Sequence, residues 1–107
     1  WIFVLDHVDA IDIIFHKGIV GETYNVGANQ EVKNLELVKS ICTLIDQKTG
    51  RKNSENLIQL VSDRPGHDKR YAIDSSKIMS QLDWFPQTKF EKGLNLTIDW
   101  YLDKLAK

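Results

Sequence analysis

The apolar residues between positions 35 and 45 recur at the spacing of one face of an α-helix, and this periodicity constrains the fold most. Asn34 can cap the start of such a helix, and the polar run from 47 to 56, which includes Gly50, closes it. The apolar face consists of Leu35, Val38, Ile41, Cys42 and Ile45. The sequence therefore predicts an amphipathic helix in the middle of the chain.

Three further helices are predicted from apolar spacing and capping residues. The first runs from Asp6, a good N-cap, to Lys17. A short helix begins at Asp74 or Ser75, and a capping box at 88–91 opens the last one. The apolar stripe of that last helix consists of Phe90, Leu94, Ile98, Tyr101 and Leu105. Such stripes usually pack into a hydrophobic core.

Four short segments between and before these helices have the composition of β-strands. They lie at 1–5, 22–26, 57–61 and 71–73. Together with the helices they predict an α/β fold of helices with short strands. The 107 residues, of which 42% are hydrophobic, form one compact domain or a piece of a larger one. Because the chain begins inside an apolar segment and without methionine, we expect it to be a fragment of a longer protein.

Composition excludes several classes of function. The formal net charge of -1 argues against a general nucleic-acid or membrane-surface binder, because such proteins show a basic excess or a basic face. No apolar run approaches the ~20 residues that span a bilayer. Cys42 is the only cysteine, so no internal disulfide can form, and a reducing, cytoplasmic location is expected. The three histidines and this cysteine lack metal-ligand spacing, so we expect no metal site.

The loop from Asp63 to Tyr71 combines cations, a rigid turn and a titratable ring. Pro65-Gly66 should turn the backbone tightly, since proline fixes φ and glycine permits positive φ. The turn would hold Arg64 and His67 near each other, where a planar guanidinium can bind phosphate oxygens in a fork. An ordinary surface turn with solvated charges is the alternative. The residues thus indicate either an anion-binding loop or a simple turn.

Four sequence motifs occur in an order that resembles a known family. They are Val4-Leu5-Asp6-His7, Gly-Glu-Thr-Tyr-Asn-Val-Gly at 21–27, Lys-Asn-Leu at 33–35, and Asp-Arg-Pro-Gly-His-Asp at 63–68 followed by Arg-Tyr-Ala-Ile-Asp at 70–74. Together they resemble the C-terminal part of the extended short-chain dehydrogenase/reductase family of nucleotide-sugar enzymes. The loop motif is narrower than the others and is similar to that of nucleotide-sugar 4,6-dehydratases.

The resemblance implies a fold and separate domains for substrate binding and for catalysis. Residues 1–107 would be the C-terminal substrate-binding lobe, and a missing N-terminal Rossmann domain would bind NAD and carry the catalytic residues. The whole protein would be a homodimeric lyase that acts on the nucleotide sugar dTDP-glucose, forming a 4-keto-6-deoxy sugar. The substrate-binding residues that the resemblance implies are Asn34, Asp63, Arg64, Pro65, Gly66 and His67. A helix-capping role for Asn34 and a solvated turn role for His67 are the alternatives.

Features of the cofactor site and of the catalytic machinery are missing from the sequence. Gly18 and Gly21 begin the spacing of a dinucleotide-binding turn, but Tyr24 stands where the next glycine is required. No tyrosine is followed four positions later by a lysine, as the family's catalytic tyrosine is, and no Thr-Asp-Glu run occurs. We therefore expect the chain alone to bind no NAD and to be inactive.

Two other functions remain open at this point. The same lobe could belong to a nucleotide-sugar epimerase or decarboxylase, although His67-Asp68 followed by Arg70-Tyr71 favours the dehydratases. A non-catalytic interaction domain, in which Arg64 and Arg70 contact a carboxylate of a partner protein, is the second alternative.

Overall fold

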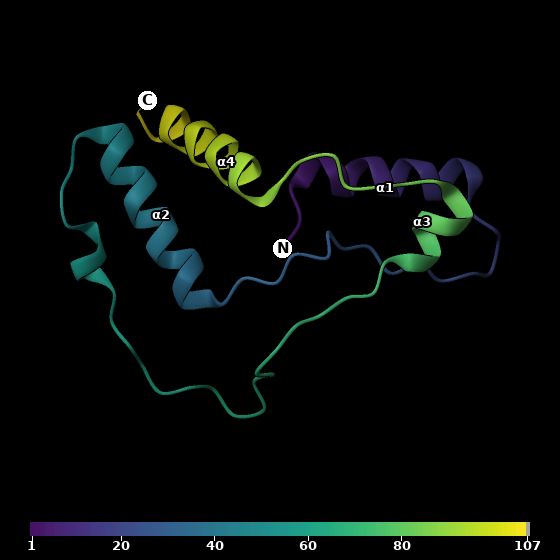
Figure 1. Ribbon diagram of the computed structural model, residues 1–107, viewed down its shortest axis with the longest axis horizontal. Helices are drawn as coiled ribbons and strands as arrows, with labels where there is room; N and C mark the ends of the chain where they lie inside the picture. Colours follow the sequence, from purple (N-terminus) through teal and green to yellow (C-terminus); the bar gives the residue numbers. More distant parts are fainter. Residues whose placement is uncertain (107) are drawn as a thin grey trace. The chain divides into compact units, whose positions relative to one another are not determined.

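The computed structural model describes residues 1–106, and in this part of the chain the regular elements are all helical (Figure 1). The elements are α1 (Val4–Lys17), α2 (Asn34–Thr49), the short 3-10 helix η1 (Ser54–Leu57), α3 (Ser76–Leu82) and α4 (Phe90–Leu105). All four predicted α-helices are thus confirmed, with boundaries that differ by a few residues. Between them run extended segments and turns.

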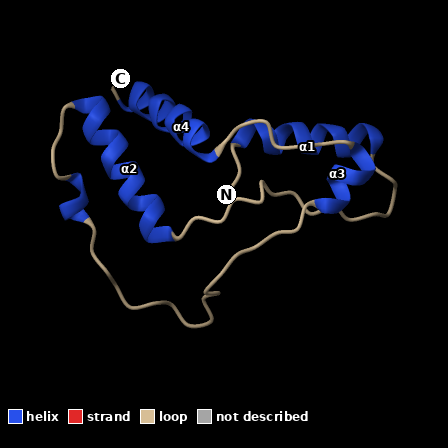
Figure 2. Cartoon of the chain, viewed as in Figure 1, coloured by secondary structure: helices blue, strands red, loops and turns tan. Residues whose placement is uncertain are grey.

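The predicted β-strands are wrong for the described residues. Figure 2 shows loops at 22–26 and 71–73, and the predicted strand at 57–61 overlaps the end of η1. The predicted strand at 1–5 is displaced by α1, which already begins at Val4. Strand propensity produces a strand only where a neighbouring strand accepts and donates the backbone hydrogen bonds. Within residues 1–106 no such neighbour is present. This part of the chain consists of helices joined by extended segments, and the predicted α/β fold is not confirmed.

The chain divides into two compact units, each made of two sequence segments. The first unit contains residues 1–31 and 72–93, and the second contains residues 32–71 together with the chain from Leu94 onward. None of the described helices combines the length and the apolar composition needed to span a membrane.

The core of the first unit is small and lies between α1 and α3. Ala10 and Ile78 are fully buried and Trp84 is 3% exposed. The side chains packed around them are partly buried; they are Ile2, Ile13, Ile14, Tyr24, Val26, Met79 and Leu82. The segment after α3 runs back along α1 in Figure 1, and this places Trp84 against the core. Trp84 therefore packs on the core directly after α3 ends.

Two buried polar side chains connect distant segments of the first unit. Asp6 is 3% exposed and its Oδ2 accepts a 2.9 Å hydrogen bond from the backbone N–H of Thr88. Ser75 is fully buried and donates its hydroxyl to the carbonyl oxygen of Gly27 at 2.9 Å. Both groups satisfy their hydrogen-bonding needs, as burial requires. Asp6 was predicted to cap α1, but it lies inside the first turn of that helix and holds the chain before α4 instead.

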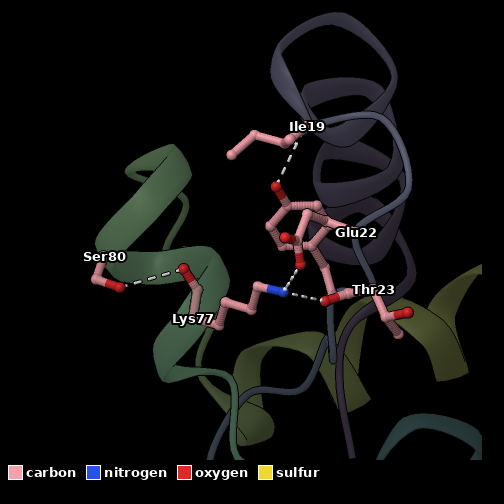
Figure 3. Close-up of polar contacts among 6 residues, drawn as sticks. Ile19, Glu22, Thr23, Lys77 and Ser80 are labelled. Atoms are coloured by element: carbon pink, nitrogen blue, oxygen red, sulfur yellow. Dashed lines mark hydrogen bonds and ion pairs between the residues drawn. The ribbon is translucent and has the colours of Figure 1, made fainter.

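Lys77 of α3 connects that helix to the Gly-Glu-Thr-Tyr motif (Figure 3). Its Nζ donates to Glu22 Oε2 at 2.6 Å and to the Thr23 carbonyl oxygen at 2.9 Å. The ammonium also lies 4.9 Å from the centroid of the Tyr24 ring, whose hydroxyl accepts a 3.1 Å bond from the N–H of Ile19. The motif is therefore held against α3 by one lysine.

Replacing Lys77 by methionine should lower the free energy of unfolding by about 0.5–1 kcal/mol, since partly exposed ion pairs and cation–π contacts are weak. Methionine keeps most of the apolar stem but removes all three interactions of the ammonium. Urea denaturation measures the change. Lys92→Met, at an exposed position of α4, is the control and should leave the midpoint unchanged. Equal effects of both variants would show that the contacts of Lys77 contribute nothing.

The second unit is organised around α2. Gly50 ends this helix in the left-handed conformation, with φ of 73°, and its N–H bonds to the Asp46 carbonyl oxygen at 3.0 Å. The Asp46 carboxylate accepts hydrogen bonds from the backbone N–H of Ser54, at 3.0 Å, and from the Ser54 hydroxyl. These bonds fix η1 against α2. Lys48 adds a 2.7 Å ion pair with Asp99 of α4.

Replacing Asp46 by alanine should lower the Tm by a few degrees at neutral pH. The hydrogen bonds from Ser54 lower the pKa of Asp46 below its ordinary value, so the ionised form is favoured in the folded state. Such a carboxylate stabilises the folded state at pH values above its pKa in the unfolded chain, which is about 4. This stabilisation is lost as the pH falls through the lower pKa that the group has in the folded state. Thermal unfolding at a series of pH values should therefore show the two Tm curves converging below about pH 4. A constant difference would contradict the role of the ionised form.

Candidate functional site

The Arg64-Pro65-Gly66-His67 segment of the second unit forms the tight turn that the sequence predicts. Gly66 has a φ of 73°, and the backbone N–H of His67 donates to the carbonyl oxygen of Arg64 at 3.3 Å. Proline before a glycine with positive φ is the pattern of a type II turn. The turn closes between the backbones of Arg64 and His67, so both side chains leave the same short loop.

Asp63 braces this turn through a single carboxylate oxygen. Its Oδ1 accepts a 2.9 Å bond from the backbone N–H of Arg64 and a 2.5 Å bond from Nδ1 of His67. The hydrogen bond from His67 is the main reason that the pKa of Asp63 lies below its ordinary value, against a smaller opposing effect of desolvation. The His67 ring also lies near Tyr71, with 6.2 Å between ring centroids. The imidazole is thus held through its Nδ1 edge.

The loop presents its cation to solvent. Every residue from 63 to 68 is exposed except His67, whose side chain is 27% exposed. Within residues 1–106 the Arg64 guanidinium takes part in no hydrogen bond or ion pair. A guanidinium that no carboxylate within these residues neutralises is suited to bind an anion.

Asn34 is the first residue of α2, and its side chain does not cap the helix. The flanking position is Lys33, and no side-chain cap hydrogen bond is formed there. Asn34 is exposed, and its first-turn position places it where a helix terminus favours negative charge. The capping interpretation of Asn34 is therefore wrong for this structure. Within residues 1–106 no hydrogen bond joins Asn34 to the turn at 63–67.

The resemblance implied Asp63 as a substrate-binding residue, and its bond to His67 was not predicted. The spacing of four positions between the two residues was the available signal. Lys77 was overlooked as well, and no local pattern in the sequence connects it with Glu22, 55 positions away. Long-range contacts of this kind depend on how the segments pack.

The described residues do not fit a dinucleotide cofactor or a metal. The stretch from Gly18 to Tyr24 contains a turn in which the N–H of Glu22 bonds to the Ile19 carbonyl oxygen at 3.0 Å, and no strand precedes it. A dinucleotide site requires a glycine-rich turn between a strand and a helix. Residues 1–106 also contain no group of three or more metal-binding side chains. The binding of an anion by Arg64, His67 and Asn34 stays a prediction.

A family profile described as GDP-mannose 4,6 dehydratase matches residues 1–97. The chain belongs to this family of nucleotide-sugar dehydratases. It is 53% identical over 105 residues to a dTDP-glucose 4,6-dehydratase of Xanthomonas campestris pv. campestris, with 95% of the chain and 30% of that protein aligned. It is 50% identical over 108 residues to the enzyme of the same name from Escherichia coli, covering 96% of the chain and 30% of the relative. The chain thus spans about a third of the length of these relatives.

Two solved structures resemble the chain over 99% of its length. A dTDP-glucose 4,6-dehydratase from Bacillus anthracis in complex with NAD has a TM-score of 0.85 and 43% identity, and the chain covers 32% of it. DesIV, a dTDP-glucose 4,6-dehydratase from Streptomyces venezuelae with NAD and TYD bound, has a TM-score of 0.83 and 32% identity, and the chain covers 31% of it. The expected resemblance to nucleotide-sugar 4,6-dehydratases is confirmed.

Proposed function

We propose that this chain is the C-terminal, substrate-binding lobe of a dTDP-glucose 4,6-dehydratase. The observation that carries the proposal is the identity of about half of the residues with proteins of that name over nearly the whole chain. Such an enzyme oxidises the hexose at C4, eliminates water across C5 and C6 and reduces C6, giving dTDP-4-keto-6-deoxyglucose. The whole protein catalyses this reaction, and this chain binds the nucleoside diphosphate of the substrate.

Arg64 is the main ligand of the diphosphate in this proposal. Its guanidinium is exposed and leaves a turn whose geometry is fixed by Gly66 and by the bond between Asp63 and His67. Such preorganisation lowers the entropy cost of binding. His67 orients the diphosphate, and Pro65 shapes the loop.

Asn34 contributes a second point of contact. Its amide is exposed on the first turn of α2, and the backbone N–H groups of that turn favour a negative ligand. An amide can donate to a phosphate oxygen or bond to a base edge. Asn34 would therefore fix the orientation of the nucleotide while Arg64 neutralises its charge.

NAD would be held by a Rossmann domain outside this chain, since the residues described here do not form a dinucleotide site. When bound there, NAD supplies the hydride chemistry.

We also propose that this Rossmann domain covers one face of α1, which is apolar and exposed in the structure. That face consists of Val4, Leu5, Val8, Ile11 and Phe15. An uncovered apolar helix face of this length is typical of an interaction surface. A homodimeric whole protein and a cytoplasmic location remain predictions.

Calorimetric titration of thymidine diphosphate into the full-length protein tests the proposal. We expect micromolar to millimolar binding, and weaker binding of guanosine diphosphate, because the relatives are named for dTDP-glucose although the family profile is described by GDP-mannose. Conversion of dTDP-glucose to a 4-keto-6-deoxy product would separate a dehydratase from an epimerase or decarboxylase. Absence of binding by the full-length protein would reject the proposal and favour an interaction domain.

A further inference from the structure

Ser75 directly precedes α3, but its side chain does not cap that helix. A serine at this position usually accepts a hydrogen bond from the first turn, and here the Ser75 side chain forms no cap bond. Asp74 accepts the backbone N–H of Ser76 instead, at 2.9 Å. The buried Ser75 hydroxyl donates to the carbonyl oxygen of Gly27, 48 positions away along the chain. The hydroxyl therefore stabilises a long-range contact and not its own helix.

Gly27 is buried on the other side of this contact, where the two backbones approach closely. A Cβ atom at Gly27 would lie 3.2 Å from Cβ of Ile73 and 3.4 Å from Oγ of Ser75. Only a residue without a side chain fits there unless these neighbours move. The end of the Gly-Glu-Thr-Tyr-Asn-Val-Gly motif thus packs directly against the end of the Arg-Tyr-Ala-Ile-Asp motif, and Figure 1 shows the two segments meeting beside α3.

All the candidate substrate-binding residues lie on the part of the chain between the two contact points. Asn34 follows Gly27, and the turn at 63–67 precedes Ser75. The segments that connect these residues to the contact are non-helical, so no series of helical hydrogen bonds fixes their backbone. Holding both ends of such a stretch restricts its conformations, which lowers the entropy cost of bringing two binding groups to one ligand.

We propose, on the basis of the function proposed above, that the Gly27–Ser75 contact positions the nucleotide-binding residues without touching the nucleotide. Ser75 is then a positioning residue. Its hydrogen bond fixes the separation between Asn34 and Arg64, which have to contact the same nucleotide together. The contact consequently affects the affinity only when both groups bind the ligand. This dependence distinguishes positioning from a general loss of the fold.

Calorimetry with thymidine diphosphate and the full-length protein tests this role. Ser75→Ala removes the hydroxyl and should weaken binding about three- to tenfold, the effect of about one lost hydrogen bond. Ile78→Val is the nearby control, because Ile78 is also fully buried on α3 but has an apolar side chain that forms no hydrogen bond. Both variants should lower the Tm slightly, and only Ser75→Ala should lose affinity. Equal affinities of the two variants would contradict the role of Ser75.

A double-mutant cycle with Asn34→Ala provides a readout that a merely structural role would not move. In the Asn34→Ala background, Ser75→Ala should change the affinity less than about twofold, since the remaining contact at Arg64 then has no partner group to be aligned with. The same loss of affinity in both backgrounds would overturn the proposal, because it would show that Ser75 acts on the stability of the fold alone.

Gly27→Ala perturbs the same contact from the other side, and it serves where Ser75→Ala does not fold. The added methyl group requires Ile73 and Ser75 to move by a few tenths of an ångström, so the affinity should fall here as well. If Arg64→Ala weakens binding and neither Ser75→Ala nor Gly27→Ala does, the proposed function stands and the positioning role is wrong. If the unmodified protein binds no nucleotide, both are wrong.

Discussion

Replacing Arg64 by alanine in the full-length protein should weaken the binding of thymidine diphosphate about ten- to a hundredfold. The guanidinium is exposed and takes part in no hydrogen bond or ion pair within residues 1–106, so its removal breaks nothing inside the described part of the chain. It does remove a charge-assisted contact to phosphate, and bonds of this kind contribute about 1.5–3 kcal/mol. Calorimetry gives the affinity, and circular dichroism checks that the fold is retained.

Two further variants make the Arg64 result specific. Arg51→Ala removes an exposed arginine from another loop of the second unit and should change the affinity less than twofold by our rough expectation for a distant surface charge. Arg64→Lys keeps the charge but not the planar fork, and should fall between the unmodified protein and Arg64→Ala. Equal losses in Arg51→Ala and Arg64→Ala would indicate a general charge effect and contradict a dedicated site.

Replacing Trp84 by alanine should lower the free energy of unfolding by about 3–5 kcal/mol, which is a large share of the stability of a small domain. Trp84 is 3% exposed and packs with Ala10 and Ile78, so the truncation leaves a cavity in the core of the first unit. Urea denaturation followed by circular dichroism measures the change. A loss of the folded signal before any denaturant is added would agree with the prediction.

Trp100 provides the matched control for this prediction. It is 56% exposed on α4, where it contacts Tyr101 edge-on and lies 5.2 Å from Lys104 Nζ. Trp100→Ala should therefore cost about 1 kcal/mol or less. If Trp84→Ala were as mild as Trp100→Ala, Trp84 would not be the anchor of the core. Ile78→Val, a smaller change at a fully buried position, should cost about 0.5–1.5 kcal/mol.

The sequence predicts the turn at Pro65-Gly66 and the helices because these features depend on neighbouring residues. Gly66 adopts positive φ, which few residues other than glycine tolerate, and Gly50 ends α2 in the same conformation. The apolar periodicity locates the helices, although it does not identify their buried faces. In α1, for example, Ala10 is buried whereas the apolar Phe15 is 83% exposed.

What the sequence could not predict are the contacts between segments that lie far apart in the chain. The resemblance to nucleotide-sugar dehydratases follows from residue order alone, and so do the candidate residues Arg64 and Asn34. The packing of the chain decides that Asp6 bonds to Thr88, that Lys77 bonds to Glu22, and that the expected strands find no partner within residues 1–106. Helical and turn preferences are energies of local backbone geometry, whereas strand pairing and buried hydrogen bonds form only when folding brings distant groups together.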